Sequence, residues 1–306
     1  MFRAFFIALS ESRMLRAAAE RSAIGRRLSG RFVAGMSVEE ALAATAATNA
    51  RGMSVSVDNL GENVTNLEEA RHSAQLYHEL IDAIIARGLN ANVSLKLTHM
   101  GLDIDEAVSR TIVGEVVAHA AKQRNFVRID MEGSPYTQKT LDIVYELHRQ
   151  PGNAGHVGAV IQSYLKRSEA DVRALCDEGI RIRLCKGAYK EPPEIAFQAK
   201  ADVDANFVSL MKILLRSGTY HGIATHDPKM IDATIAFARA EHVRPDSFEF
   251  QMLYGVRRDL QEQLVRDGWG MRVYIPFGTE WYPYLMRRLA ERPANAIFIL
   301  KNLFRR

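Results

Sequence analysis

Residues 284–291, near the C-terminus, carry side chains whose types and spacing could bind an anion. In a helix, Tyr284, Arg287, Arg288 and Glu291 would occupy positions i, i+3, i+4 and i+7, which lie on one face. Two adjacent guanidinium groups repel each other unless an anion lies between them, and arginine can bind a carboxylate or phosphate through two parallel hydrogen bonds. The segment could also be a solvent-exposed basic turn at a helix end, where arginine is favourable in any case. This stretch alone leaves both interpretations open.

A second set of polar residues lies at the ends of short apolar segments that are rich in β-formers. If these segments are parallel strands of one sheet, their carboxyl ends meet at one edge, where the chemistry of a barrel is carried out. Convergence of so many charged and amide groups predicts a large polar ligand between them. The set consists of Asp58 with Glu62, Lys96, Asp130, Gln162, Arg183 with Lys186, Thr225-His226-Asp227, Glu249 with Gln251, and Tyr274.

The segments that must position these residues alternate between strand-like and helix-like patterns. Stretches with helical periodicity, such as Asn66–Arg87, Asp105–Arg124 and Asp202–Arg216, separate the strand-like segments, and this alternation is typical of βαβ units with a parallel sheet. The predicted strands number eight, which is the number that closes a (βα)8 barrel. They are Met53–Val57, Val93–Leu97, Phe126–Met131, Val157–Gln162, Ile180–Cys185, Gly222–His226, Phe248–Met252 and Met271–Ile275.

A doubly wound open sheet is the competing fold. Such sheets usually carry a Gly-x-Gly-x-x-Gly turn after the first strand, whereas this chain has Asp58-Asn59-Leu60-Gly61-Glu62 there. We therefore predict an α/β fold with one catalytic barrel domain over residues 49–306, preceded by an N-terminal helical arm over residues 1–48. Residues 13–31 of this arm are rich in arginine, with Glu20 as the only acid, which is compatible with a membrane-surface helix or with a helix packed on the barrel.

Composition narrows the function classes. The chain has 306 residues and a formal net charge of +4, which is too small to indicate nucleic-acid binding. Two cysteines, Cys176 and Cys185, argue against a disulfide framework and are compatible with a reducing compartment. No apolar run approaches the length of about 18 residues that a transmembrane helix requires.

The polar residues allow three chemistries. Lys96 or Lys186 could form a Schiff base, as in a barrel lyase, although either lysine could instead bind an anion or form an ion pair. Metal hydrolysis is the weakest option, because no His-x-His pair lies on a predicted strand. Flavin chemistry needs hydrogen-bond partners along the ring edge and cations for a pyrophosphate, which the predicted edge supplies. A non-catalytic barrel that binds an anionic metabolite is a further possibility.

Eight segments of the chain resemble those of a known family, the monofunctional bacterial proline dehydrogenases. Each matching segment is weak alone, but eight in the same order over most of the predicted barrel are specific. They are Ser94–Leu97, Arg128–Glu132, Ile161–Tyr164, Arg183–Tyr189, Ala224–Asp227, Phe248–Gly255, Tyr274–Gly278 and the Tyr-x-x-Arg-Arg segment that ends at Glu291. Asn59 and Cys185 depart from the usual leucine and valine of the family.

The resemblance implies a distorted (βα)8 barrel with the last helix over the barrel mouth, non-covalent FAD, and oxidation of L-proline to Δ1-pyrroline-5-carboxylate. Asp130 and Arg183 would be catalytic, Arg183 near the flavin N5. Glu62 and Arg287 would form an ion pair that closes the site. The substrate would contact Lys96, Tyr274, Tyr284, Leu253, Arg287 and Arg288, and FAD would contact Met131, Gln162, Arg183, Lys186, Gly187, Ala188, Thr225, His226 and Glu291.

The same resemblance implies partners and a location. Hydride would pass from proline C5 to flavin N5, and the electrons would then go to a membrane quinone. A separate pyrroline-5-carboxylate dehydrogenase would oxidise the product, because the chain has no second catalytic domain. We therefore expect a cytoplasmic protein that associates peripherally with the inner membrane.

Overall fold

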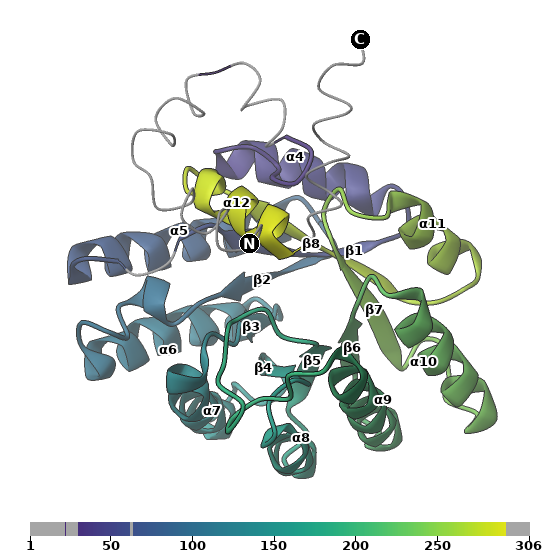
Figure 1. The fold of residues 1–306 in the computed structure, drawn as a ribbon. Coiled ribbons are helices and arrows are strands. Elements are labelled where there is room, and N and C mark those ends of the chain that lie inside the picture. The colour runs from purple at the N-terminus through teal and green to yellow at the C-terminus, as the bar shows by residue number, and fades with distance from the viewer. Residues whose placement is uncertain (1–21, 23–29, 62–63, 292–306) are drawn as a thin grey trace.

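The computed structural model describes residue 22, residues 30–61 and residues 64–291, and for residues 287–291 it describes the backbone alone. Eight parallel strands pair in sequence order and close into a barrel, since β1 pairs with both β2 and β8 (Figure 1). The predicted closed barrel is therefore confirmed, and the open sheet is excluded. The strands are β1 Ser54–Asn59, β2 Ala91–Leu95, β3 Val127–Ile129, β4 Val157–Gln162, β5 Arg181–Cys185, β6 His221–Ala224, β7 Phe248–Leu253 and β8 Met271–Phe277.

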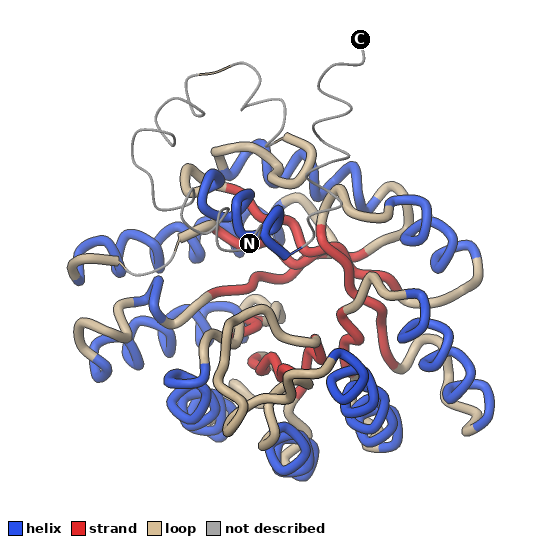
Figure 2. The backbone as a smooth tube through the Cα atoms, in the orientation of Figure 1, coloured by secondary structure: helices blue, strands red, loops and turns tan. Residues whose placement is uncertain are grey.

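Helices surround the strands, as the tube in Figure 2 shows. The predicted stretches Asn66–Arg87 and Asp105–Arg124 correspond to α5 and α6, whose first turns are capped by the side chains of Asn66 and Asp105. The helices are α4 Val38–Asn49, α5 Leu67–Ala86, α6 Glu106–Lys122, α7 Ser134–Arg149, α8 Ser168–Asp177, α9 Lys200–Arg216, α10 Pro228–Ala240, α11 Arg258–Arg266 and α12 Trp281–Glu291, with a short 3-10 turn η1 Thr98–Met100.

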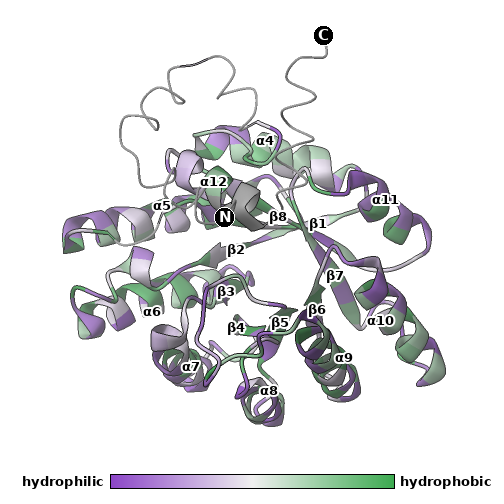
Figure 3. Cartoon of the chain, viewed as in Figure 1, coloured by the Kyte–Doolittle hydropathy of each residue, from purple (hydrophilic) through white to green (hydrophobic). Residues whose placement is uncertain are grey.

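The core lies between the strands and the inner faces of these helices. Apolar residues recur on one face of α5 at helical spacing, including Ala70, Ala74, Ile81 and Ile84, and all four are buried. In Figure 3 the helices around the barrel carry both hydrophobic and hydrophilic residues, as expected for helices with one face on a core and one in water. Within the described residues, no helix is both long enough and apolar enough to cross a bilayer.

Two helices depart from a simple alternating barrel. Helix α4 precedes β1 yet packs against both β1 and β8, so it covers the wall at the seam where the barrel closes. Helix α12 follows β8 but packs through Trp281 and Tyr284 on Leu60, which comes directly after β1. Because Leu60 lies beyond the carboxyl end of β1, α12 lies at that end of the barrel, in agreement with the expected last helix over the mouth. The proposed division at residue 48 stays a prediction, since most of the arm is outside the described residues.

Candidate active site

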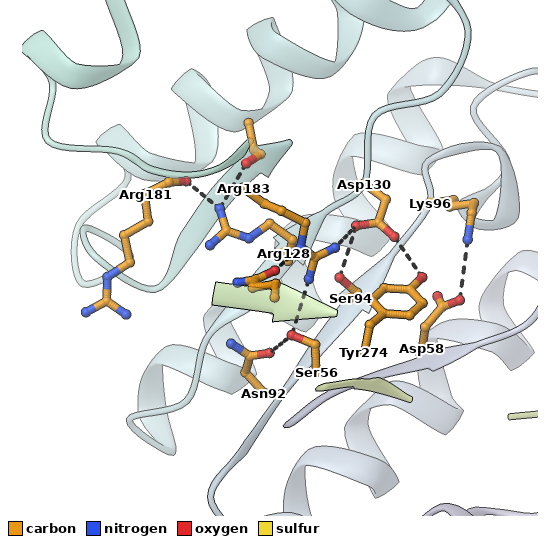
Figure 4. A network of polar contacts seen from close by, with 12 residues as sticks. Ser56, Asp58, Asn92, Ser94, Lys96, Arg128, Asp130, Arg181, Arg183 and Tyr274 are labelled. Carbon is orange, nitrogen blue, oxygen red and sulfur yellow. Dashed lines mark hydrogen bonds and ion pairs between the residues drawn. The ribbon is translucent and has the colours of Figure 1, made fainter. Parts of the chain in front are cut away.

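Asp130 and Arg183 form a buried ion pair at the centre of the site (Figure 4). Asp130 directly follows β3, and Arg183 lies in the middle of β5, with its Nη1 donating to Asp130 Oδ1 at 2.7 Å. Ser94 Oγ donates to the same oxygen at 3.0 Å, and the Tyr274 hydroxyl donates to Oδ2 at 2.9 Å. The end of β3 therefore presents a carboxylate that side chains from β2, β5 and β8 hold in one orientation.

The Arg183 guanidinium is fixed at each of its three nitrogen atoms. Besides the bond to Asp130, Nε donates to Gln251 Oε1 at 2.6 Å and Nη2 donates to Ser56 Oγ at 3.3 Å. The Tyr274 ring lies 5.1 Å from the guanidinium carbon, a cation–π distance. Burial and the nearby carboxylates raise the pKa of Tyr274 well above its usual value, so its hydroxyl stays protonated and remains a donor.

Asp58 is a second buried carboxyl group near the centre. It lies on β1, and Lys96, one residue beyond β2, places Nζ 3.4 Å from Asp58 Oδ2. Burial raises the pKa of Asp58 to about 6; the Lys96 charge opposes this effect, and the Asp130 charge adds to it. The Tyr77 hydroxyl reaches in from α5, 3.4 Å from Asp58 Oδ1 and 2.8 Å from the Ser94 carbonyl oxygen. Asp58 can therefore gain or lose a proton close to neutral pH.

Lys186, at the end of β5, is paired with two carboxylates. Its Nζ lies 2.5 Å from Asp204 Oδ1 and 2.7 Å from Asp227 Oδ2, and the side chain is 25% exposed. Burial acts to raise the pKa of Asp227, but the hydrogen bond and charge of Lys186 outweigh burial and lower it to about 2. Lys96 and Lys186 are therefore both engaged in ion pairs, which is the alternative to Schiff-base chemistry that the sequence left open for them.

Gly187 has a φ of +106°, and a Cβ atom there would lie 2.3 Å from the Tyr164 ring. The positive φ and the close packing against Tyr164 both require a glycine here, and the predicted contact of Gly187 with FAD stays a prediction. Farther along the same loop, Glu191 accepts from the Ser134 N–H at 2.7 Å at the start of α7. This contact anchors the loop that carries Lys186, Gly187 and Ala188 to the neighbouring helix.

Thr225, His226 and Gln162 lie at the expected carboxyl ends of their strands. The prediction was wrong for Glu249, which is the second residue of β7 and pairs with Arg272 at the start of β8, so it lies at the amino-terminal end of the barrel. His226 Nε2 accepts from the Leu253 N–H at 2.9 Å, so the ring proton must be on Nδ1 when the histidine is neutral. Thr225 Oγ1 accepts from the Asp227 N–H at 3.1 Å. Gln162 Nε2 donates to the Glu132 carbonyl at 3.0 Å, which joins the end of β4 to the segment after β3 that contains the buried Met131.

Helix α12 brings the C-terminal motif to the same end of the barrel. Its helical backbone confirms the spacing on which the one-face argument for Tyr284, Arg287, Arg288 and Glu291 depends. Tyr284 is buried among Trp281, Leu60 and their neighbours. The side chains of Arg287, Arg288 and Glu291, and the whole of Glu62, lie outside the described part of the structure, so the proposed gate stays a prediction.

Sequence reasoning did not single out Ser56, Ser94 or Tyr77. Ser56 and Asp58 are two residues apart on β1, as Ser94 and Lys96 are at the end of β2, so period-two alternation from a charged rim residue could have identified both serines. Tyr77 lies on the apolar face of α5, where a tyrosine looks like an ordinary core residue. Gln251 was recognised as a rim residue, but its contact with Arg183 was not.

Known proteins resemble this chain in sequence and fold. Residues 41–301 match the family described as proline dehydrogenase. Proline dehydrogenase 2 of Bacillus subtilis (strain 168) is 42% identical over 301 residues, which cover 98% of each chain. Proline dehydrogenase of Deinococcus radiodurans is 41% identical, covering 91% of this chain and 90% of the relative.

A solved structure extends the likeness to the fold. The crystal structure of proline utilization A from Bdellovibrio bacteriovorus, inactivated by N-propargylglycine, superposes with a TM-score of 0.83 and 26% identity. It covers 92% of this chain, while this chain spans 34% of that larger protein. The family match over residues 41–301 and the similarity to two relatives over nine-tenths or more of each chain agree with the barrel fold: this chain is an oxidoreductase that belongs to the proline dehydrogenase family.

Proposed function

We propose that this enzyme oxidises L-proline to Δ1-pyrroline-5-carboxylate with non-covalent FAD, by hydride transfer from proline C5 to flavin N5. The observation that carries this proposal is the buried Asp130–Arg183 pair, held by four strands at the catalytic end of the barrel. Tyr274 contacts this pair directly and Lys96 pairs with the neighbouring Asp58, so an aromatic wall and a basic side chain are available near a rigid polar centre. A small, anionic, cyclic substrate suits that combination.

The residues at the rim fit FAD in their chemistry. Lys186 is a cation at the mouth of the barrel and suits a pyrophosphate, while Arg183 and Gln162 are buried polar groups suited to a flavin ring edge. FAD would supply the two-electron acceptor. The residues that we propose hold it are Met131, Gln162, Arg183, Lys186, Gly187, Ala188, Thr225, His226 and Glu291.

The protein's part in the reaction is to bind and orient proline. Arg287, Arg288 and Lys96 would hold the carboxylate, while Tyr274, Tyr284 and Leu253 would enclose the pyrrolidine ring. Asp130 and Arg183 act on the reacting end of the substrate through charges that are already oriented, so no reorganisation is required during the reaction. Holding the reacting carbon at attack distance is worth several kcal/mol, roughly 7 or more in well-oriented intramolecular reactions.

We also propose how the site closes and where the electrons and the product go. An ion pair between Glu62 and Arg287 would close the site over proline and exclude water. Electrons would leave for a membrane quinone during peripheral contact with the inner membrane from the cytoplasm, with the basic arm of residues 1–48 as the contact. A separate pyrroline-5-carboxylate dehydrogenase would consume the product.

The visible spectrum of the purified protein tests this function. We expect flavin absorption, release of FAD on heat denaturation, and bleaching of the flavin bands when L-proline is added without oxygen. The product should be trapped as a pyrroline by o-aminobenzaldehyde. A protein with bound flavin that proline leaves oxidised would refute the substrate, and a colourless protein whose lysine is trapped by borohydride with a carbonyl compound would indicate a lyase instead.

A further inference from the structure

Gln251 lies between two charged groups with opposite hydrogen-bonding requirements. Its Nε2 donates to Glu249 Oε1 at 2.6 Å, and its Oε1 accepts from Arg183 Nε at 2.6 Å. An ionised carboxylate can only accept and a guanidinium can only donate, so the orientation of this amide is determined by its two partners. A glutamine is the neutral side chain that satisfies both neighbours at once.

Glu249 is itself held as a carboxylate. Arg272 Nε donates to Glu249 Oε1 at 2.6 Å, and the Tyr220 hydroxyl donates to Oε2 at 2.9 Å. Burial acts to raise the pKa of Glu249, but the charge and hydrogen bond of Arg272 keep it below its usual value. The partner that orients Gln251 is therefore ionised and fixed at neutral pH.

Gly222 makes the contact between Gln251 and Arg183 geometrically possible. Strand β6 separates β5 from β7, and its Gly222 pairs in register with Arg183 on one side and Glu249 on the other. A Cβ atom on Gly222 would lie 2.2 Å from Gln251 Nε2, and the φ of this glycine is outside the positive range. Position 222 requires a glycine because it has no side chain, and not because of an unusual backbone conformation. The Gln251 side chain lies across β6 in the space that a Cβ atom on residue 222 would occupy.

We propose that Gln251, lying across Gly222, is a positioning residue that fixes the plane of the Arg183 guanidinium for the redox step. Gln251 binds Nε, the guanidinium nitrogen nearest the strand. The two outer nitrogen atoms, Nη1 and Nη2, bind Asp130 and Ser56. Loss of this contact leaves the guanidinium held only at its two outer nitrogen atoms, so its plane can tilt about the bonds to Asp130 and Ser56. The inference rests on the proposed flavin-dependent function, because Arg183 acts there on the reacting centre.

Two substitutions at different positions test the proposal. Gln251→Leu removes the acceptor, and Gly222→Ala leaves Gln251 in place but pushes it from Arg183. For both we expect flavin content and the proline dissociation constant to stay within about twofold of wild type. The anaerobic rate of flavin reduction should fall by about 10- to 100-fold, the scale of a misplaced catalytic group. The flavin reduction potential should shift in the same direction in both.

The double variant Gly222→Ala/Gln251→Leu supplies the sharper readout. If both changes act through one contact, the double variant should reduce no more slowly than the poorer single variant, whereas independent effects would multiply. Asn125→Ala is the stability control, since Asn125 is a buried amide at the amino-terminal end of β3 that caps the Ala91 carbonyl at 3.2 Å. It should lower the melting temperature without changing the reduction rate.

Reduction rates within twofold of wild type in both single variants would overturn the proposal and leave Gln251 with a structural role. If Gln251→Leu does not fold, Gly222→Ala and Gln251→Asn, which shortens the side chain, answer the same question. Wild-type protein in the same experiment separates this inference from the proposed function: a wild type that proline does not reduce contradicts the function, whereas a reduced wild type with equally fast variants contradicts the inference alone.

Discussion

Arg183 Nη1, from the middle of β5, lies 2.7 Å from Asp130 Oδ1, directly after β3, and both side chains are buried. Neither charge can be removed without leaving the other in a medium of low polarity, where an unpaired ion is costly. The pair is also hydrogen-bonded to Ser94, Tyr274 and Gln251. A centre with this many fixed partners is rigid before substrate arrives, which is the arrangement that favours electrostatic stabilisation of a transition state.

Asp130→Asn should therefore affect both stability and catalysis. We expect the free energy of unfolding in urea to fall by about 3–5 kcal/mol, the usual cost of breaking a buried pair from one side. Proline-dependent flavin reduction should slow strongly in the same protein. Glu178→Gln is the matched control, because it breaks an ion pair with the largely exposed Arg149 and should cost less than about 1 kcal/mol. Equal losses in the two variants would contradict the account.

Tyr274→Ser should change substrate selectivity. Under the proposed function the Tyr274 ring presses on the part of proline that carries the hydroxyl in hydroxyproline, so a smaller side chain should admit the hydroxylated ring. The measurement is the ratio of kcat/KM for hydroxyproline to that for proline. Tyr274→Phe keeps the bulk and loses the hydrogen bond to Asp130, so it should leave the ratio near the wild-type value. An unchanged ratio in Tyr274→Ser would remove this residue from the ring pocket.

Asp58 should lower the free energy of unfolding as the pH rises, which is the opposite of the usual effect of a carboxyl group. Its folded pKa of about 6 lies above the value of about 4 expected in the unfolded chain. Its contribution is fully present below about pH 4 and is lost as the pH rises through about 6, because the unfolded chain then releases the proton more readily. Asp58→Asn should consequently gain up to about 3 kcal/mol relative to wild type between pH 4 and pH 7. A difference in unfolding free energy that is constant over this range would show that the carboxyl group titrates normally.

Gly187→Ala should lower the stability of the protein by more than the cost of the backbone conformation alone. Gly218 also has a positive φ, +77°, but open space around it, so Gly218→Ala measures the cost of a positive φ alone, which is about 1–2 kcal/mol. At Gly187 the added methyl group also overlaps the Tyr164 ring, which should add roughly 1–3 kcal/mol. Thermal melting curves compare the two, and flavin release near the transition of Gly187→Ala alone would link the Lys186 loop to FAD. Similar melting temperatures in the two variants would contradict the packing argument.

Arg288→Met tests the proposed anion site on α12. Loss of a charged, hydrogen-bonded partner of the substrate carboxylate should weaken proline binding by about 2–5 kcal/mol, while FAD remains bound. Titration of the oxidised flavin spectrum with a non-reducible proline analogue measures the affinity. Arg149→Met, on the exposed surface, should leave it unchanged. Simultaneous loss of flavin from Arg288→Met would place this arginine at the cofactor instead.

The sequence predicted the strands well because each is a short run of β-branched and apolar residues between helical stretches. It was less accurate at their ends: β3 spans Val127–Ile129, so Asp130 follows the strand instead of lying within it, and Lys96 is likewise one residue beyond β2. Strand polarity predicted the convergence of most polar residues, since all parallel strands end on one side, but it misplaced Glu249, which lies near the start of β7. Strand polarity did not predict their partners: the bonds from Tyr77 and Ser56, and the raised pKa of Asp58, depend on burial and register that a linear pattern does not contain.

The most direct test of the account follows flavin reduction with selectively deuterated proline under anaerobic single-turnover conditions. Hydride transfer from C5 predicts that deuterium at C5 slows flavin bleaching several-fold, while deuterium at C2 leaves the rate unchanged. Asp130→Asn should reduce the rate and keep the isotope effect at C5, because the residue orients and stabilises without changing which bond breaks. An isotope effect at C2 alone, or flavin that proline does not bleach, would contradict the proposed reaction.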